Sequence, residues 1–136
     1  MDNEKIIHQF DLVIYPARVW IGINIPFYDV KEKFYGLDIS LERAEITEKE
    51  YFPDTFSTAR TYTVSDKKDG WIGTLVVLWQ PKKCDVGIMA HEAVHCADFI
   101  CESFGIESRG FSGGEPYAYL LQWIVRCIEK VKLNKL

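Results

Sequence analysis

The sequence predicts an α+β fold, because strand-like and helix-like patterns occupy separate halves of the chain. Residues 1–80 contain short segments rich in β-branched and aromatic side chains, separated by turn residues. Residues 84–131 contain two longer segments with helical spacing of their apolar side chains, joined by a glycine-rich stretch. A chain of 136 residues is long enough for one domain and short for two. We therefore expect a single domain over 1–136, sheet-rich at first and helical afterwards.

Two hairpins are predicted in the sheet-rich part. Phe10–Tyr15 and Val19–Ile25 are the candidate strands of the first, joined by a short turn that contains a proline. Ala59–Val64 and Trp71–Gln80 are the candidate strands of the second, and the sequence SDKKDG between them is a clear turn. The sheet is therefore expected to be small and mostly antiparallel.

The segment Gly36–Thr47 permits two interpretations. Its apolar residues alternate at Leu37, Ile39 and Leu41, which favours a strand with one exposed face. The sequence LERAEITEKE, which overlaps its end, could instead begin a short helix. Both interpretations stay open at this point.

Two helices are predicted in the second half. The first spans Val86–Phe104, and Gly105 is suited to end it. The second begins at Glu115 or Pro116, since proline fits the first turn of a helix, and it runs to about Val131. This second helix is apolar nearly all round, so we expect it to be buried against the rest of the domain.

Composition and charge exclude several classes of function. The net charge is −4 and no strongly basic segment stands out, so nucleic acid is not an expected partner. The longest strongly apolar run, WIGTLVVLW, is far shorter than a membrane span, and the first residues do not resemble a signal peptide. We therefore expect a cytoplasmic protein whose cysteines are free thiols packed as small apolar side chains. These are Cys84, Cys96, Cys101 and Cys127. The sequence does not predict an oligomeric state.

The motif that carries chemistry is HEAVH at residues 91–95, which matches the pattern HExxH. On a helix, His91 and His95 lie one turn apart on the same face, so that both imidazoles can bind one zinc ion. Glu92 lies about 100° around the helix from His91, beside the ligands. We therefore predict that Glu92 is the catalytic general base that activates a zinc-bound water.

A third ligand is needed, because catalytic zinc usually has three protein ligands and one water. Asp98 and Glu102 continue the polar stripe of the histidines, but Asp98 lies about 10 Å along the helix axis from His91, too far for one ion. Glu115 is the predicted third ligand. It begins the second helix, and the twenty residues after His95 suffice for the chain to turn back.

This pattern resembles the gluzincin branch of zinc metallopeptidases, in which HExxH is followed by a glutamate ligand on a second helix. The matching residues are His91, Glu92 and His95, with Glu115 in GGEPYAYLLQW. The chain is also similar to small phage and prophage-type putative metallopeptidases, in which a β-rich segment precedes the HExxH helix. The resemblance covers about residues 71–125 and implies a zincin-like fold. It also implies a peptide or protein substrate that lies along an edge strand, for which Gly70–Gln80 is the candidate.

Four further residues have supporting roles in this interpretation. Asp98 is expected to accept the second N–H of a ligand histidine. Tyr117, Tyr119 and Arg109 are candidates for donating a hydrogen bond to the oxyanion of the reaction. The predicted function is that of a zinc-dependent peptidase or amidase with one zinc ion per chain. The alternative is a non-catalytic zinc-binding protein that uses the same scaffold to bind a partner.

Overall fold

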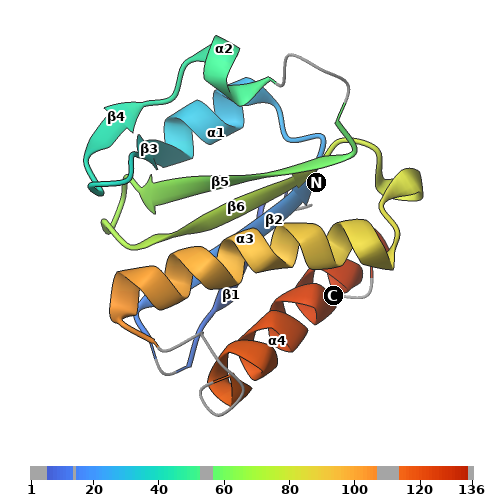
Figure 1. Ribbon diagram of the computed structural model, residues 1–136. Coiled ribbons are helices and arrows are strands. Elements are labelled where there is room, and N and C mark those ends of the chain that lie inside the picture. Colours follow the sequence, from blue (N-terminus) through green and yellow to red (C-terminus); the bar gives the residue numbers. More distant parts are fainter. Residues whose placement is uncertain (1–5, 14, 53–56, 107–113, 135–136) are drawn as a thin grey trace.

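The α+β class is confirmed by a computed structural model that describes residues 6–13, 15–52, 57–106 and 114–134 (Figure 1). The described residues form one mixed sheet with helices on both of its faces. The strands are β1 (His8–Asp11), β2 (Ala17–Ile23), β3 (Phe34–Leu37), β4 (Arg43–Glu45), β5 (Ala59–Asp66) and β6 (Ile72–Leu78). The helices are α1 (Phe27–Lys33), α2 (Glu48–Tyr51), α3 (Val86–Phe104) and α4 (Glu115–Lys132), with a short 3₁₀ turn at Pro81–Lys83.

The sheet has the strand order β1-β2-β6-β5-β3-β4. Both predicted hairpins are present as antiparallel pairs, β1 with β2 and β5 with β6. The first strand is shorter than predicted and ends at Asp11, whereas β5 extends to Asp66 and takes in the start of the SDKKDG sequence. Strands β2 and β6 pair in parallel at the centre, and the other pairings are antiparallel, as expected for a mostly antiparallel sheet.

The segment Gly36–Thr47 is neither one strand nor the start of a helix. It contains the end of β3, a turn and β4, which pair as a short antiparallel hairpin. Helix α2 begins only after it, where the Thr47 side chain accepts a hydrogen bond from the Glu50 backbone N–H and the Glu50 carboxylate accepts one from the Thr47 backbone N–H. This capping box explains why the helix begins at Glu48 and not earlier.

Helix α1 was not predicted. It spans seven residues after Pro26, and only Val30 among them is buried. A helix this short with one buried residue has no apolar period to detect. Its position next to β3 depends on tertiary packing, which local sequence patterns do not describe.

The two long helices match their predicted ranges closely. Helix α3 begins where the Asp85 carboxylate accepts a hydrogen bond from the Ile88 backbone N–H at 3.0 Å, and it ends at Gly105, which has a left-handed φ of 67°. A residue with a Cβ is strained in that conformation, so glycine suits this position. Helix α4 begins at Glu115, with Pro116 in its first turn. Among the described residues, no helix is long and apolar enough to cross a membrane.

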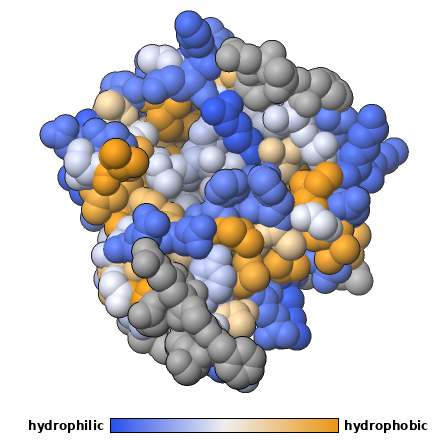
Figure 2. Space-filling model, viewed as in Figure 1, coloured by the Kyte–Doolittle hydropathy of each residue, from blue (hydrophilic) through white to orange (hydrophobic). Residues whose placement is uncertain are grey.

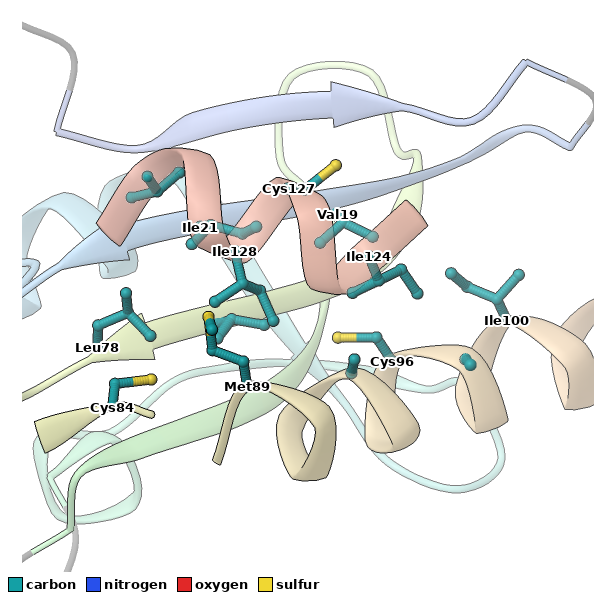
Figure 3. Close-up of a cluster of buried hydrophobic side chains, with 14 of the residues drawn as sticks. Val19, Ile21, Leu78, Cys84, Met89, Cys96, Ile100, Ile124, Cys127 and Ile128 are labelled. Atoms are coloured by element: carbon teal, nitrogen blue, oxygen red, sulfur yellow. The ribbon is translucent and has the colours of Figure 1, made fainter. Parts of the chain in front are cut away.

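The core has two layers of packing, one on each face of the sheet. Helices α3 and α4 cover one face, where their apolar side chains meet those of β2 and β6 (Figure 3). Helices α1 and α2 lie over the other face, which holds an aromatic-rich cluster around Trp20, Phe34 and Tyr51. The four cysteines are free and buried, as predicted, and burial raises the pKa of Cys96 to about 12. The buried side of α3 belongs to the first of these clusters, and its opposite side is exposed.

Candidate active site

The two histidines of the HEAVH motif approach each other on the exposed side of α3. Their Nε2 atoms are 3.3 Å apart, and both side chains are exposed. Two nitrogen ligands on a tetrahedral zinc ion, each at 2.0–2.1 Å, lie roughly 3.3–3.4 Å apart. The spacing therefore fits two ligands of one ion, although it also permits one hydrogen bond between the rings. Figure 2 shows hydrophilic patches interrupted by hydrophobic ones across the middle of this face, where α3 lies.

Glu92 differs from the histidines because it is buried, with only 6% of its surface exposed. The Thr61 hydroxyl of β5 donates a hydrogen bond to Glu92 Oε1 at 2.7 Å. A carboxylate that is removed from water needs such a donor, and the bond fixes the direction of the side chain. Thr61 of the sheet thus holds one oxygen of the Glu92 carboxylate. Glu92 directly follows His91, one of the two exposed histidines.

The half of β5 beside Glu92 has an open edge. Strand β3 pairs with Val64–Asp66, and its last residue, Leu37, accepts a hydrogen bond from the Thr63 hydroxyl at 3.0 Å. The described residues include no strand partner for Ala59–Tyr62 on the side away from β6. Asp66 donates its N–H to Trp71 O, and Trp79 donates its N–H to Thr58 O, so the even-numbered residues of this strand bond to β6. The backbone groups of the odd-numbered residues point outward instead. Ala59 and Thr61 are the odd-numbered residues of the open part, whereas Thr63 faces Leu37 of β3.

Strand β6 is not the edge strand that the sequence suggested. It lies between β2 and β5 in the centre of the sheet, and its residues Gly73–Leu78 are buried. A strand that is covered on both faces reads as a continuous apolar run, which WIGTLVVLW is. The predicted position of an edge-bound substrate along Gly70–Gln80 is therefore wrong, and the open edge belongs to the preceding strand.

Asp98 and Tyr117 hydrogen-bond to each other. The Tyr117 hydroxyl donates to Asp98 Oδ1 at 2.9 Å, which ties α4 to α3. Burial, together with this bond to an anionic acceptor, raises the pKa of Tyr117 to about 12. The Tyr117 hydroxyl proton is thus bonded to the Asp98 carboxylate. That Asp98 accepts an N–H of a ligand histidine stays a prediction.

Glu115 and Tyr119 lie apart from the histidine pair. Glu115 is exposed in the first turn of α4, two residues before Tyr117. Because α4 runs opposite to α3 in Figure 1, this places Glu115 toward the Gly105 end of α3. Tyr119 is 65% exposed and lines a separate apolar pocket with Leu12 and Trp123. Arg109 lies outside the described residues.

Among the residues that the structure describes, no group of three or more His, Cys, Asp or Glu side chains converges as a metal site. The structure brings together two predicted ligands, His91 and His95, and gives Glu92 a defined partner. Thr61 was missed by sequence reasoning. The alternation of Ala59–Val64 puts Thr61 and Thr63 on one face, but it does not indicate which helix covers that face.

Comparison with known proteins does not assign this site. No protein-family model matches the chain, and no match is found among curated proteins or solved structures.

Proposed function

We propose that the chain is a small zinc-dependent hydrolase that cleaves peptide or amide bonds. The observation that carries the proposal is the convergence of His91 and His95, whose Nε2 atoms are 3.3 Å apart on the exposed side of α3. The adjacent Glu92 is held by β5 and is available as a base. This combination of two ligands and a fixed carboxylate supports a catalytic site more than a structural one, which needs no base.

The proposed metal ligands are His91, His95 and Glu115. A bound zinc ion supplies Lewis acidity and lowers the pKa of a coordinated water toward about 7. The ligand role of Glu115 requires the first turn of α4 to come closer to the histidine pair. Metal binding commonly drives such local rearrangement, because the ion recovers free energy only when its ligands converge.

Glu92 is proposed to move the proton. Thr61 occupies Oε1, so Oε2 is the oxygen left to accept a proton from the attacking water and return it to the leaving nitrogen. Positioned acid–base catalysis of this kind contributes about 10²–10⁴ in rate. The burial of Glu92 also limits the directions that its carboxylate can adopt, which favours a productive geometry.

The open edge of β5 supports a peptide substrate. An extended peptide can pair with the outward backbone groups of Ala59 and Thr61, as a short added strand. The scissile bond of this peptide then lies next to Glu92, because Thr61 belongs to the open edge and its hydroxyl also contacts the Glu92 carboxylate. An open strand beside an HExxH helix is also what the proposed zincin-like fold requires.

The experiment is a screen of internally quenched peptides with zinc-loaded wild type, Glu92→Gln and the control Glu129→Gln. Glu129 is an exposed glutamate on α4 that the proposal gives no role. We expect hydrolysis by wild type and the control and a loss of at least about 10²-fold in Glu92→Gln. Zinc binding without hydrolysis by any of the three proteins would instead indicate a non-catalytic zinc-binding protein.

A further inference from the structure

A cleft of about 620 Å³ lies beside His95, between α3 and the β3–β4 hairpin. Its walls are mainly apolar and include Leu37 and Leu41 from the hairpin and Phe99 from α3. Thr63 of β5 forms part of the lining. The cleft therefore adjoins the histidine pair, and it reaches β5 at Thr63, where the open edge ends against Leu37.

The charged groups in this cleft are of one sign. Asp38, Asp98 and Glu102 line it, and none of its described lining residues is a lysine or arginine. Hydrogen bonds from the Glu42 backbone N–H and from Ser40 hold the pKa of Asp38 below its ordinary value, so Asp38 is charged near neutral pH. An apolar cleft with several carboxylates favours an occupant that combines an aliphatic part with a positive charge.

We infer that this cleft receives a lysine or arginine side chain of a peptide bound along β5. The position of that peptide rests on the proposed function. The methylene groups of that side chain pack between Leu37, Leu41 and Phe99. Its cationic end reaches the carboxylates of the cleft. The site thus selects substrates with a basic residue near the cleaved bond.

The strand register places that residue. Thr61 and Thr63 point to the same face of β5, because side chains alternate along a strand, and they are about 7 Å apart. Thr61 contacts Glu92, whereas Thr63 lines the cleft. Leu37 of β3 takes the position opposite Thr63, so the peptide residue opposite Thr61 is the one whose long side chain extends past Thr63 into the cleft. The basic residue is expected within two positions of the scissile bond.

The test measures binding, so that it does not depend on turnover. ¹⁵N-labelled, full-length Glu92→Gln protein is titrated with acetyl-Ala-Ala-Lys-Ala-Ala-amide and with the same peptide carrying norleucine, which has the aliphatic chain without the charge. We expect the lysine peptide to bind about five- to thirty-fold more tightly, since each exposed ion pair contributes modestly. The shifted amide signals should include Thr63, Asp98 and Glu102.

A matched variant separates charge from shape. Asp98→Asn combined with Glu102→Gln should remove most of the preference for lysine and leave norleucine binding unchanged, whereas Glu129→Gln should preserve both. The preference should also weaken at high salt. Equal binding of the two peptides, or shifts confined to other parts of the protein, would overturn the inference. Lysine-selective binding by a protein that hydrolyses no peptide would contradict the proposed function and leave this inference standing.

Discussion

The two halves of strand β5 have different surroundings. In Val64–Asp66 the strand pairs on both sides, and the Arg43 Nε donates to Ser65 Oγ at 3.1 Å. In Ala59–Tyr62 it pairs on one side only, and Thr61 bonds to Glu92. The paired half satisfies its polar groups within the fold, while the other half leaves backbone donors and acceptors outward next to the HEAVH helix. The open part of the sheet and the candidate catalytic residues thus coincide.

A second contrast reinforces the first. The turn that follows the paired half contains a network in which Arg18 Nη1 lies 2.6 Å from Asp69 Oδ2, and Lys33 Nζ lies 3.1 Å from Asp66 Oδ2. Arg18 also stacks over Trp71, 4.2 Å from the ring centroid. These groups join β2, α1 and the β5–β6 turn. We therefore expect changes in the paired half to affect stability and changes beside the open half to affect activity.

Among the changes that test this comparison, Thr61→Val is expected to have the largest effect on the catalytic rate. It keeps the shape of the side chain and removes its hydroxyl. A hydrogen bond to a carboxylate contributes about 1.5–3 kcal/mol, so kcat should fall about 10- to 100-fold with little change in KM. Thr61→Ser should restore most of the rate, because it returns the donor. Steady-state kinetics with the best peptide from the screen measures this, and equal rates for wild type and Thr61→Val would contradict the positioning role.

A smaller effect is expected from Ala59→Pro. Proline removes an N–H that points to the open edge and leaves the bonds between β5 and β6 intact. The loss of one edge hydrogen bond should raise KM about three- to ten-fold without loss of the fold.

The matched control for this variant is Arg60→Pro, because the Arg60 N–H bonds to β6. That change should destabilise the protein by about 3 kcal/mol or more, measured by chemical denaturation. If Ala59→Pro leaves KM unchanged, the peptide does not bind along this edge.

The smallest effect is expected from Asp69→Asn in the turn that follows the paired half. The hydrogen bond from Arg18 lowers the pKa of Asp69 from its ordinary value of 3.8. Because the folded-state pKa is below the unfolded one, the stabilisation is complete above about pH 4 and is lost as pH falls through the folded-state value. Asp69 is 38% exposed, so the solvent-screened difference from wild type should be below about 1 kcal/mol at pH 6.

Denaturation at pH 6 and pH 2.5 measures that difference, and a double-mutant cycle with Arg18→Met isolates the pair. Peptide hydrolysis by Asp69→Asn should equal that of wild type. A stability difference that is the same at both pH values would show that the ion pair is not its cause.

The parts of this fold that could be predicted from sequence are those set by local signals. The span of α3 follows from its apolar period and from Gly105, and the convergence of the two histidines follows from a spacing of four residues on a helix. The β5–β6 hairpin follows from its turn sequence. Each of these depends on residues that are close together in the chain.

The remaining features depend on contacts between distant segments. The edge of β5 is open because β3 pairs with only three of its residues. The extent of that pairing cannot be predicted from the sequence of either strand alone. Glu92 is buried because the sheet lies beside α3. The helical spacing in the sequence gives only the angular position of Glu92 around the helix axis. The continuous apolar run of β6 did carry a usable signal, because it indicates a central strand and not an edge.

The central claim, that His91 and His95 bind one zinc ion, is tested most directly by metal content. Purified wild type is compared with His95→Ala, Glu115→Gln and His8→Ala, the last of which changes a histidine on β1. We predict about one zinc per chain in wild type and in His8→Ala, weaker retention in Glu115→Gln and almost none in His95→Ala. The same zinc content in His95→Ala as in wild type would contradict the account.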